Sequence, residues 1–437
     1  MQVNLIPHQK AVLDATKEFN RVAYYLDMGL GKTFVGAEKM AQLGNNTNLI
    51  VCQKSKVDDW EWHMLDYYSD RYVIFNLTEK GKIGKFLECP HLKVGIINYD
   101  VLYRRDVLQT LKGFTLMLDE SSVIKNDRAK RTKAVMKLKA DNVILLSGTP
   151  TGGKYEELWS QCRLLGWNIG KTMFLNTYTK YTMVDYGQGF KQRLIYGYKN
   201  VDRLKNKLHE HGAVFMKTDE VITLPEQNFF TVSVPRNSDY DEFVNERAVM
   251  LHRSDGELVP DADGDYMRVK WLVGDTTLTK MLYMRQLCGQ YSKEKLQAFE
   301  DLIASSDDRF VVFYNFTDEL NEMLKRIGNR KYSVVNGQTK DLKAYEGDCN
   351  SITFVQYQAG AMGLNLQKAN RIIYFTLPLS SELYEQSKKR IHRVGQQRPC
   401  FYYTLLTEWS IEEKIKKTLE RRQDFTEKLF EKEYEND

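Results

Sequence analysis

The segment RVAYYLDMGLGKT, residues 21–33, joins an apolar run to a glycine-rich turn. The run from Arg21 to Leu26 predicts a strand that is buried on both faces, as strands of parallel sheets are. The turn ends in Gly-Lys-Thr and leads into a helical pattern that continues to Leu43. Strand, glycine-rich loop and helix in this order predict the start of an α/β domain whose loop binds a nucleotide phosphate.

The residue types of this loop fit phosphate chemistry. Backbone N–H groups surround phosphate oxygens only where no Cβ blocks the approach, which accounts for Gly29 and Gly31. Lys32 would reach the β- and γ-phosphates, and Thr33 would bind Mg²⁺. The long form of this motif has glycine where Leu26 stands, so the pattern is the shorter G-x-G-K-T variant. A glycine-rich turn that merely starts a helix is the alternative interpretation.

The strand and helix pattern recurs along the chain. Further apolar runs lie at 48–52, 93–98, 114–118 and 142–146, and a second series lies at 310–315, 332–335, 351–355, 371–375 and 401–406. We predict two tandem, RecA-like, doubly wound parallel-sheet lobes of the α/β class, with helical insertions. The first lobe spans 1–225 with a helical protrusion at about 153–220. The second spans 226–437 with a linker, a polar loop at 253–265 and a closing helix from Ile411.

Composition excludes several classes of protein. A chain of 437 residues, 42% hydrophobic and 28% charged, is typical of a soluble protein with more than one core. No apolar run approaches the roughly 20 residues of a membrane span. The N-terminus lacks a signal-peptide pattern, so we expect a cytoplasmic protein, and we expect a monomer. Six scattered cysteines form no C-x-x-C pair, which argues against a zinc site. The net charge of +5 is compatible with a polyanionic partner.

A second motif places two acids directly after a predicted buried strand. The segment FTLMLDE ends in Asp119 and Glu120. Asp119 could hold Mg²⁺ and Glu120 could polarise the attacking water of a hydrolysis reaction. Two solvated acids at a strand end are the alternative interpretation. Because loops at the carboxyl ends of parallel strands converge, Lys32 and this acidic pair together predict one ATP site.

Over nearly its whole length the chain resembles the Swi/Snf-type ATPases of the superfamily 2 helicase-like proteins. The similar segments are LIPHQ (5–9), MGLGKT (28–33), IVCQKSKVDDWEWH (50–63), INYDVL (97–102), DESS (119–122), LSGTP (146–150), MRQLCGQ (284–290), VFYNF (312–316), AGAMGLNLQKANRIIYF (359–375), QSKKRIHRVGQ (386–396) and SIEEKI (410–415). Three departures stand out, namely Ser121-Ser122 where the family has Ala-His, Tyr357-Gln358 in the fifth motif, and Lys389 in the sixth.

The resemblance implies roles for further residues. Gln9 would read adenine, and Gly363 would contribute to nucleotide binding, with ATP and Mg²⁺ as cofactors. Arg390 and Arg393 would act as arginine fingers, because permanently charged guanidinium groups suit the γ-phosphate oxygens. Their spacing of three predicts that both lie on one face of a helix. The alternative is a solvated basic face.

The resemblance also implies an ATP-driven translocase on double-stranded DNA. A strand-separating DNA or RNA helicase and a nucleotide-gated binding module remain alternatives. The compact length favours a bacterial or phage protein. Cations interleaved with tyrosines between Lys171 and Lys199 predict contacts to nucleic acid, for which Lys180, Lys191 and Arg193 are the candidates. An ordinary helical insertion with a solvated lysine face explains the same segment equally well.

Overall fold

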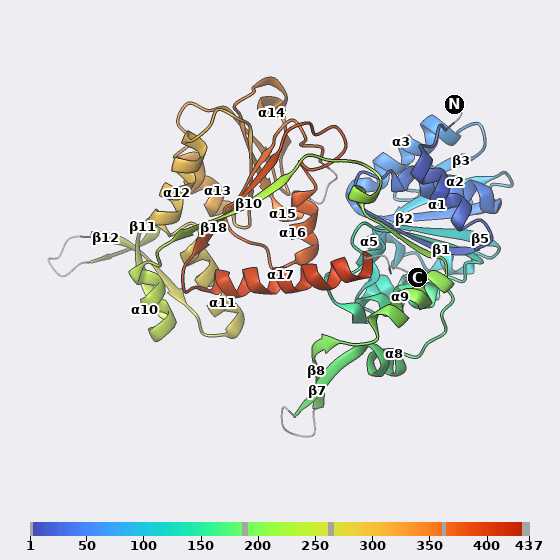
Figure 1. Ribbon diagram of the computed structural model, residues 1–437, viewed down its shortest axis with the longest axis horizontal. Coiled ribbons are helices and arrows are strands. Elements are labelled where there is room, and N and C mark those ends of the chain that lie inside the picture. The colour runs from blue at the N-terminus through green and yellow to red at the C-terminus, as the bar shows by residue number, and fades with distance from the viewer. Residues whose placement is uncertain (1–2, 186–190, 261–265, 361–363, 431–437) are drawn as a thin grey trace, which may run out of the picture. The chain divides into compact units, whose positions relative to one another are not determined.

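The computed structural model describes residues 3–185, 191–260, 266–360 and 364–430, with side chains at all of these except 253–256, 260 and 423–430. The chain divides into two compact units (Figure 1). The first comprises the residues up to Thr223 together with those from Arg422 onward, and the second comprises Leu224–Arg421. Among the described residues, no helix is both long and apolar enough to cross a membrane.

The first unit is built on a seven-stranded sheet with the order β3-β4-β2-β5-β6-β1-β9. Its described neighbouring strands all pair in parallel. The strands are β1 (Arg21–Leu26), β2 (Thr47–Cys52), β3 (Val73–Asn76), β4 (Lys93–Asn98), β5 (Phe114–Asp119), β6 (Asn142–Leu146) and β9 (Ala213–Met216). The helices are α1 (Pro7–Ala15), α2 (Lys32–Leu43), α3 (Val57–Tyr68), α4 (Lys82–Glu88), α5 (Tyr99–Leu102), α6 (Lys130–Lys137), α7 (Trp159–Leu164), α8 (Lys171–Tyr178) and α9 (Val201–Glu210).

The alternation of side chains along β1 shows why this unit has a core on each face of its sheet. Ala23 and Tyr25 belong to one buried apolar cluster. Val22, Tyr24 and Leu26 belong to another. Because successive side chains of a strand point to opposite faces, an uninterrupted apolar run requires helices on both sides of the sheet.

The second unit repeats this architecture with the strand order β10-β18-β17-β13-β16-β14-β15. Within this sheet, only the short β15 runs antiparallel to its neighbour among the described pairs. The strands are β10 (Gln227–Val234), β13 (Phe310–Tyr314), β14 (Tyr332–Val335), β15 (Lys340–Asp341), β16 (Ile352–Gln356), β17 (Arg371–Tyr374) and β18 (Cys400–Thr407). The helices are α10 (Ser238–Glu246), α11 (Thr277–Cys288), α12 (Lys293–Ala304), α13 (Thr317–Leu324), α14 (Lys343–Gly347), α15 (Tyr357–Gly360), α16 (Ser381–Lys388) and α17 (Ile411–Phe430), of which the residues from Arg422 onward belong to the first unit. The predicted class, two tandem parallel-sheet α/β lobes, is confirmed.

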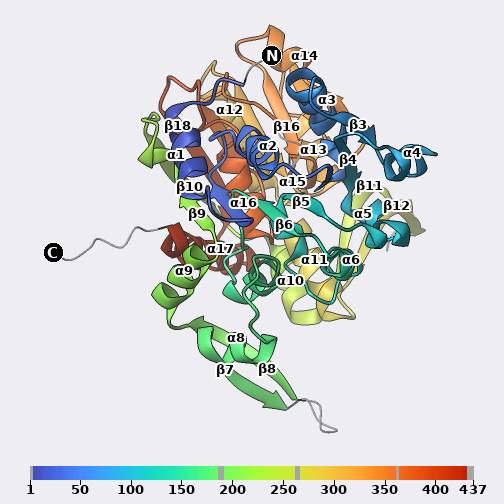
Figure 2. The ribbon, with the colours of Figure 1, turned by 90° about the vertical axis from the view of Figure 1, so that its right-hand side faces the viewer.

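Two antiparallel hairpins correct the sequence-based prediction. Residues 179–198, expected to be helical, form β7 (Thr179–Asp185) and β8 (Lys191–Tyr198). Strand β7 (TKYTMVD) contains Thr, Tyr and Val, and β8 (KQRLIYGY) contains Ile and Tyr, residue types that fit a pleated strand better than a helix. Figure 1 and Figure 2 both show this hairpin extending away from the sheet of its unit.

The second hairpin replaces most of the loop expected at 253–265. Strand β11 (Ala248–Pro260) continues through residues 253–260 and pairs with β12 (Tyr266–Val273). The register is irregular between His252 and Glu257. Pairing with the apolar residues of β12 outweighs the turn-like local composition, because strand preference depends on cross-strand neighbours. Residues 261–265 lie outside the described part of the chain.

Candidate nucleotide site and nucleic-acid interface

Three adjacent strands of the first unit bring the predicted ATP motifs together. The sheet order places β6 between β5 and β1. The carboxyl end of β5 carries the acidic pair, that of β6 leads into the LSGTP segment, and that of β1 leads into the phosphate loop. A Cβ built on Gly148 would lie 3.2 Å from Lys32 Nζ, so the loop after β6 closely approaches the phosphate loop. Ligands of open α/β sheets bind at this edge of the sheet.

The phosphate loop has the backbone conformation that its glycines permit. Gly29 has φ 89° and Gly31 has φ 73°, in the left-handed region that L side chains rarely adopt. Gly31 is the N-cap of α2, so the positive end of that helix points at the loop. Lys32 Nζ donates to the main-chain carbonyls of Leu26 at 2.7 Å and Asp27 at 3.1 Å. The ammonium group therefore lies within the loop that the motif predicts.

Gln9 lies against this loop from the first turn of α1. Its side chain is buried, accepts from the Ile6 N–H at 3.1 Å, and donates to the Leu30 carbonyl at 3.3 Å. A Cβ on Gly31 would lie 2.1 Å from Gln9 Nε2. The residue expected to read adenine is thus packed directly on the phosphate loop.

The acidic pair is held by hydrogen bonds from the segments that follow three other strands. Asp119 Oδ2 accepts from Trp60 Nε1 at 2.8 Å, and the Asp119 carbonyl accepts from the Tyr99 hydroxyl at 2.9 Å. Glu120 Oε1 accepts from the Ser147 hydroxyl at 2.7 Å. From the sequence alone we predicted no individual role for Trp60, Tyr99 or Ser147. Their positions after β2, β4 and β6 were the available signal, since such loops converge with the loop after β5.

Glu120 has a strained backbone. Its φ of 54° is left-handed although the residue is not glycine. Such conformations cost about 1–3 kcal/mol and gather at functional sites. Ser122, at one of the departures from the family pattern, donates to Glu120 Oε1 at 3.1 Å. The Glu120 carboxylate contacts the loop after β6, where Ser147 donates to it.

The residues predicted to hold Mg²⁺ have suitable chemistry. Thr33 is the second residue of α2, and Asp119 ends β5. A hydroxyl and a carboxylate are the hard oxygen donors that Mg²⁺ prefers, and the metal usually completes its shell with water and substrate phosphates. Gly363, expected at the nucleotide, lies outside the described residues.

Arg390 and Arg393 of the second unit lie in turns after α16, which ends at Lys388. The prediction that they share a helix face is wrong. The Arg390 carbonyl accepts from the Leu366 N–H at 3.0 Å, and Arg393 Nη1 donates to Asn365 Oδ1. The Arg390 N–H donates to the Ser387 carbonyl at 3.2 Å, three residues back, and both arginines also bond to residues 364–366. Burial lowers the pKa of the Arg393 guanidinium.

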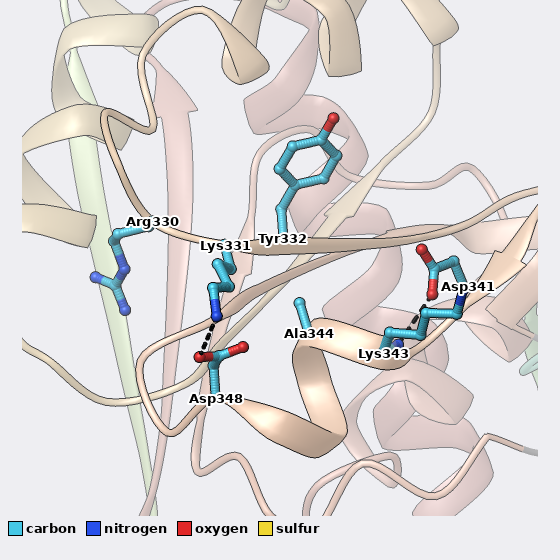
Figure 3. Close-up of a pocket in the computed structure, with 7 residues that line it drawn as sticks. All are labelled: Arg330, Lys331, Tyr332, Asp341, Lys343, Ala344 and Asp348. Atoms are coloured by element: carbon cyan, nitrogen blue, oxygen red, sulfur yellow. Dashed lines mark hydrogen bonds and ion pairs between the residues drawn. The ribbon is translucent and has the colours of Figure 1, made fainter.

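A pocket of about 550 Å³ in the second unit is lined by Arg330, Lys331, Tyr332, Asp341, Lys343, Ala344 and Asp348 (Figure 3). It lies where β14 begins, whereas the predicted motifs follow the carboxyl ends of strands. Lys331 Nζ bonds to Asp348 Oδ1 at 3.1 Å, and Arg330 donates to four main-chain carbonyls. These cations are engaged within the protein, so the pocket is a poor candidate for a nucleotide site.

The three candidate nucleic-acid residues all lie on the β7–β8 hairpin. Asp185 pairs with Lys191 and Met183 pairs with Arg193, which places Lys191 and Arg193 on one face. Lys180 belongs to the opposite face, since it lies an odd number of positions from Met183 along β7. Lys180 and Lys191 are exposed, whereas the Arg193 guanidinium lies over the Tyr181 ring at 4.4 Å.

Other members of the basic, aromatic segment have roles within the protein. Lys171 forms an ion pair with Asp127 at 2.6 Å. Tyr178 is buried, and the Tyr198 hydroxyl donates to Glu156 Oε2 at 2.7 Å. Lys171, Tyr178 and Tyr198 are therefore engaged within the protein, whereas Lys180 and Lys191 of the hairpin and Lys199 after it are exposed.

Comparison with known proteins finds two matching family models. The SNF2-related domain matches residues 26–289, and the Helicase conserved C-terminal domain matches residues 294–395. A curated relative, the "Putative ATP-dependent helicase/translocase YwqA" of Bacillus subtilis, is 24% identical, with 93% of this chain and 46% of the relative covered. The "DNA repair and recombination protein RAD54B" of Gallus gallus is 24% identical, with 86% and 47% covered.

A viral relative has nearly the same length. The "Probable global transactivator" of Orgyia pseudotsugata multicapsid polyhedrosis virus is 23% identical, with 98% of this chain and 92% of the relative covered. By contrast, the chain spans about half the length of the first curated relatives. A solved structure, the "Sulfolobus solfataricus SWI2/SNF2 ATPase core in complex with dsDNA", is 19% identical with a TM-score of 0.46, and 98% of this chain and 93% of that chain are covered.

Proposed function

The chain belongs to the SNF2-related domain family, and we propose that it hydrolyses ATP and uses the energy to move along double-stranded DNA. The observation that carries the proposal is the meeting of the phosphate loop, the LSGTP segment and the acidic pair on three neighbouring strands. The names of the Bacillus subtilis and Gallus gallus relatives, an ATP-dependent helicase/translocase and a DNA repair protein, support the same class of activity.

Each predicted site residue of the first unit then has a defined role. Lys32 and the backbone N–H groups of the phosphate loop bind the phosphates, while Thr33 and Asp119 hold Mg²⁺. The bound metal supplies positive charge to the β- and γ-phosphates. Glu120 orients the attacking water, and the Ser147 hydroxyl holds the Glu120 carboxylate in place by donating a hydrogen bond to it.

The second unit supplies the proposed arginine fingers. Arg393 is partly exposed and bonds to Asn365, whereas Arg390 is buried. A guanidinium group is planar and permanently charged, so it can stabilise charge spread over several phosphate oxygens. Both arginines form hydrogen bonds with residues 364–366, which supports the proposal that one segment positions both guanidinium groups.

The β7–β8 hairpin is the proposed contact to DNA. A two-stranded ribbon fits the major groove, where phosphates line both sides. Lys180 on one face and Lys191 with Arg193 on the other match such an arrangement. Contacts of this kind neutralise phosphates without reading bases, so little sequence preference is expected.

The test is the rate of ATP hydrolysis without nucleic acid and with double-stranded DNA, single-stranded DNA and RNA. We expect the strongest stimulation by double-stranded DNA, falling steeply with salt as counterion release requires. Lys32→Ala should abolish turnover in an otherwise folded protein. Preferential stimulation by RNA would contradict the proposal and favour the helicase alternative, which strand displacement from a duplex would detect.

The hairpin is tested by replacing Lys180, Lys191 and Arg193 together with Ala. Stimulation by DNA should weaken while basal turnover is kept. The control variant also loses three positive charges, by replacement of the exposed Lys112, Lys137 and Lys139 with Ala. These lysines precede β5 and β6 and so lie at the amino ends of the strands, opposite the proposed ATP site. Equal loss of stimulation in both variants would indicate a general effect of net charge and remove the hairpin from the interface.

A further inference from the structure

Trp60 makes a direct contact with the proposed metal-binding carboxylate. The side chain is 2% exposed, and its indole Nε1 donates to Asp119 Oδ2 at 2.8 Å. Trp60 lies on α3, which follows β2, and β2 is the neighbour of β5 in the sheet. The contact therefore joins the helix that follows β2 to the end of β5.

This hydrogen bond restricts the carboxylate. The χ2 torsion of an aspartate has a broad distribution, so a carboxylate without a hydrogen-bond partner samples many orientations. The indole N–H can only donate, and burying it without an acceptor costs about 1–3 kcal/mol. Because the buried indole N–H of Trp60 donates to Asp119 Oδ2, it favours one orientation of the carboxylate. In that orientation Oδ1 can bind a cation or a water of its hydration shell.

Ring contacts hold Trp60 itself. Its ring meets His63 edge-on at 5.8 Å, and His63 meets Phe34 edge-on at 4.7 Å. Phe34 directly follows Thr33, the other proposed Mg²⁺ ligand. Burial lowers the pKa of His63 to about 4, so the ring is neutral at physiological pH and adds no competing positive charge. One aromatic cluster thus connects the segments that carry both proposed metal ligands.

We propose that Trp60 is a positioning residue, whose indole N–H orients the Asp119 carboxylate for Mg²⁺. The inference rests on the proposed role of Asp119 in holding the metal. It assigns to Trp60 a task that ordinary packing does not require, because a phenylalanine would fill much of the same apolar space without the donor.

The test is Trp60→Phe, measured by the Mg²⁺ dependence of binding of a fluorescent ADP analogue and of ATP hydrolysis. We expect the Mg²⁺ concentration for half-saturation to rise about tenfold or more, the scale of a hydrogen bond to a charged group. Saturating Mg²⁺ should restore most of the turnover, since the donor acts on metal binding. Unchanged half-saturation would overturn the proposal.

Two controls separate this role from packing. Trp62, on the same helix, is 70% exposed, so Trp62→Phe should leave the Mg²⁺ dependence unchanged. In an Asp119→Ala background, Trp60→Phe should add nothing, whereas an equal further loss would show that Trp60 does not act through Asp119. If Trp60→Phe does not fold, a benzothiophene analogue of tryptophan at position 60 removes the N–H while keeping the shape.

The outcome also distinguishes this inference from the proposed function. Nucleotide binding by the wild-type protein that ignores Mg²⁺, together with a normal Asp119→Ala variant, would overturn the metal site itself. A clear Mg²⁺ dependence that is lost in Asp119→Ala but kept in Trp60→Phe would overturn only the role of Trp60.

Discussion

Replacement of Gly31 by alanine tests how the phosphate loop is built. Gly31 has φ 73° at the N-cap of α2, and an added Cβ would lie 2.1 Å from Gln9 Nε2. At that distance the Gln9 side chain must move. Because Gln9 is buried, moving it breaks its bonds to the Ile6 N–H and the Leu30 carbonyl.

The expected cost follows from these terms. A left-handed conformation costs alanine about 1 kcal/mol or slightly more, and two hydrogen bonds contribute about 1 kcal/mol each. Gly31→Ala should therefore lower the free energy of unfolding by about 3 kcal/mol. Gly44 is the matched control, because it has φ 71° at the other end of α2 while its Cβ would meet nothing closer than 4.0 Å. Gly44→Ala should cost about 1 kcal/mol, the backbone term alone.

Urea unfolding followed by circular dichroism measures both variants, and a fluorescent ATP analogue measures binding. Only Gly31→Ala should weaken ATP binding, because only there is Gln9 displaced from the phosphate loop. Equal destabilisation by the two substitutions, or normal ATP binding by Gly31→Ala, would refute the reasoning that Gln9 and the loop form one unit.

Four further substitutions, one of them a control, test two proposed catalytic groups and one buried acid. Glu120→Gln should bind ATP normally but hydrolyse it about 10²-fold more slowly in single-turnover assays; joint loss of binding would indicate a nucleotide-binding group instead. Arg393→Ala should lower turnover about 10³-fold with little change in ATP affinity, whereas Arg398→Ala, which breaks an exposed ion pair with Asp308, should leave turnover unchanged. Burial raises the pKa of Glu319 from 4.5 to about 7. Between these values the native state holds a proton that the unfolded state has released, so stability falls as pH rises through this window, by on the order of 3 kcal/mol. Glu319→Gln should remove that dependence in unfolding measurements at pH 5 and pH 7.5, and an unchanged pH dependence would contradict the assignment.

Local sequence determined the strands and the loops that follow them. The apolar runs such as Arg21–Leu26 and Lys93–Asn98 were predictable because parallel strands with helices on both faces need apolar side chains at every position. The glycines of the phosphate loop and the acids after β5 were also recognisable, because phosphate and metal chemistry restricts the residue types that can stand there.

Prediction failed where distant contacts outweigh local pattern. Residues 179–198 were expected to be helical, although the β-branched and aromatic residues of β7 and β8 fit strands, and their cross-strand pairing makes them a hairpin. Arg390 and Arg393 have helical spacing, but their turns bond to residues 364–366 of another segment. A local pattern does not contain the partner that decides these conformations.

The sequence by itself determined that the chain has two parallel-sheet lobes and that the motifs of an ATP site follow particular strands. Only the tertiary structure decided which groups surround Asp119 and Glu120. Trp60, Tyr99 and Ser147 follow β2, β4 and β6, and the sheet order β4-β2-β5-β6 brings those loops beside the acidic pair. That order differs from the order along the chain, because helical crossovers let strands distant in sequence become neighbours in the sheet.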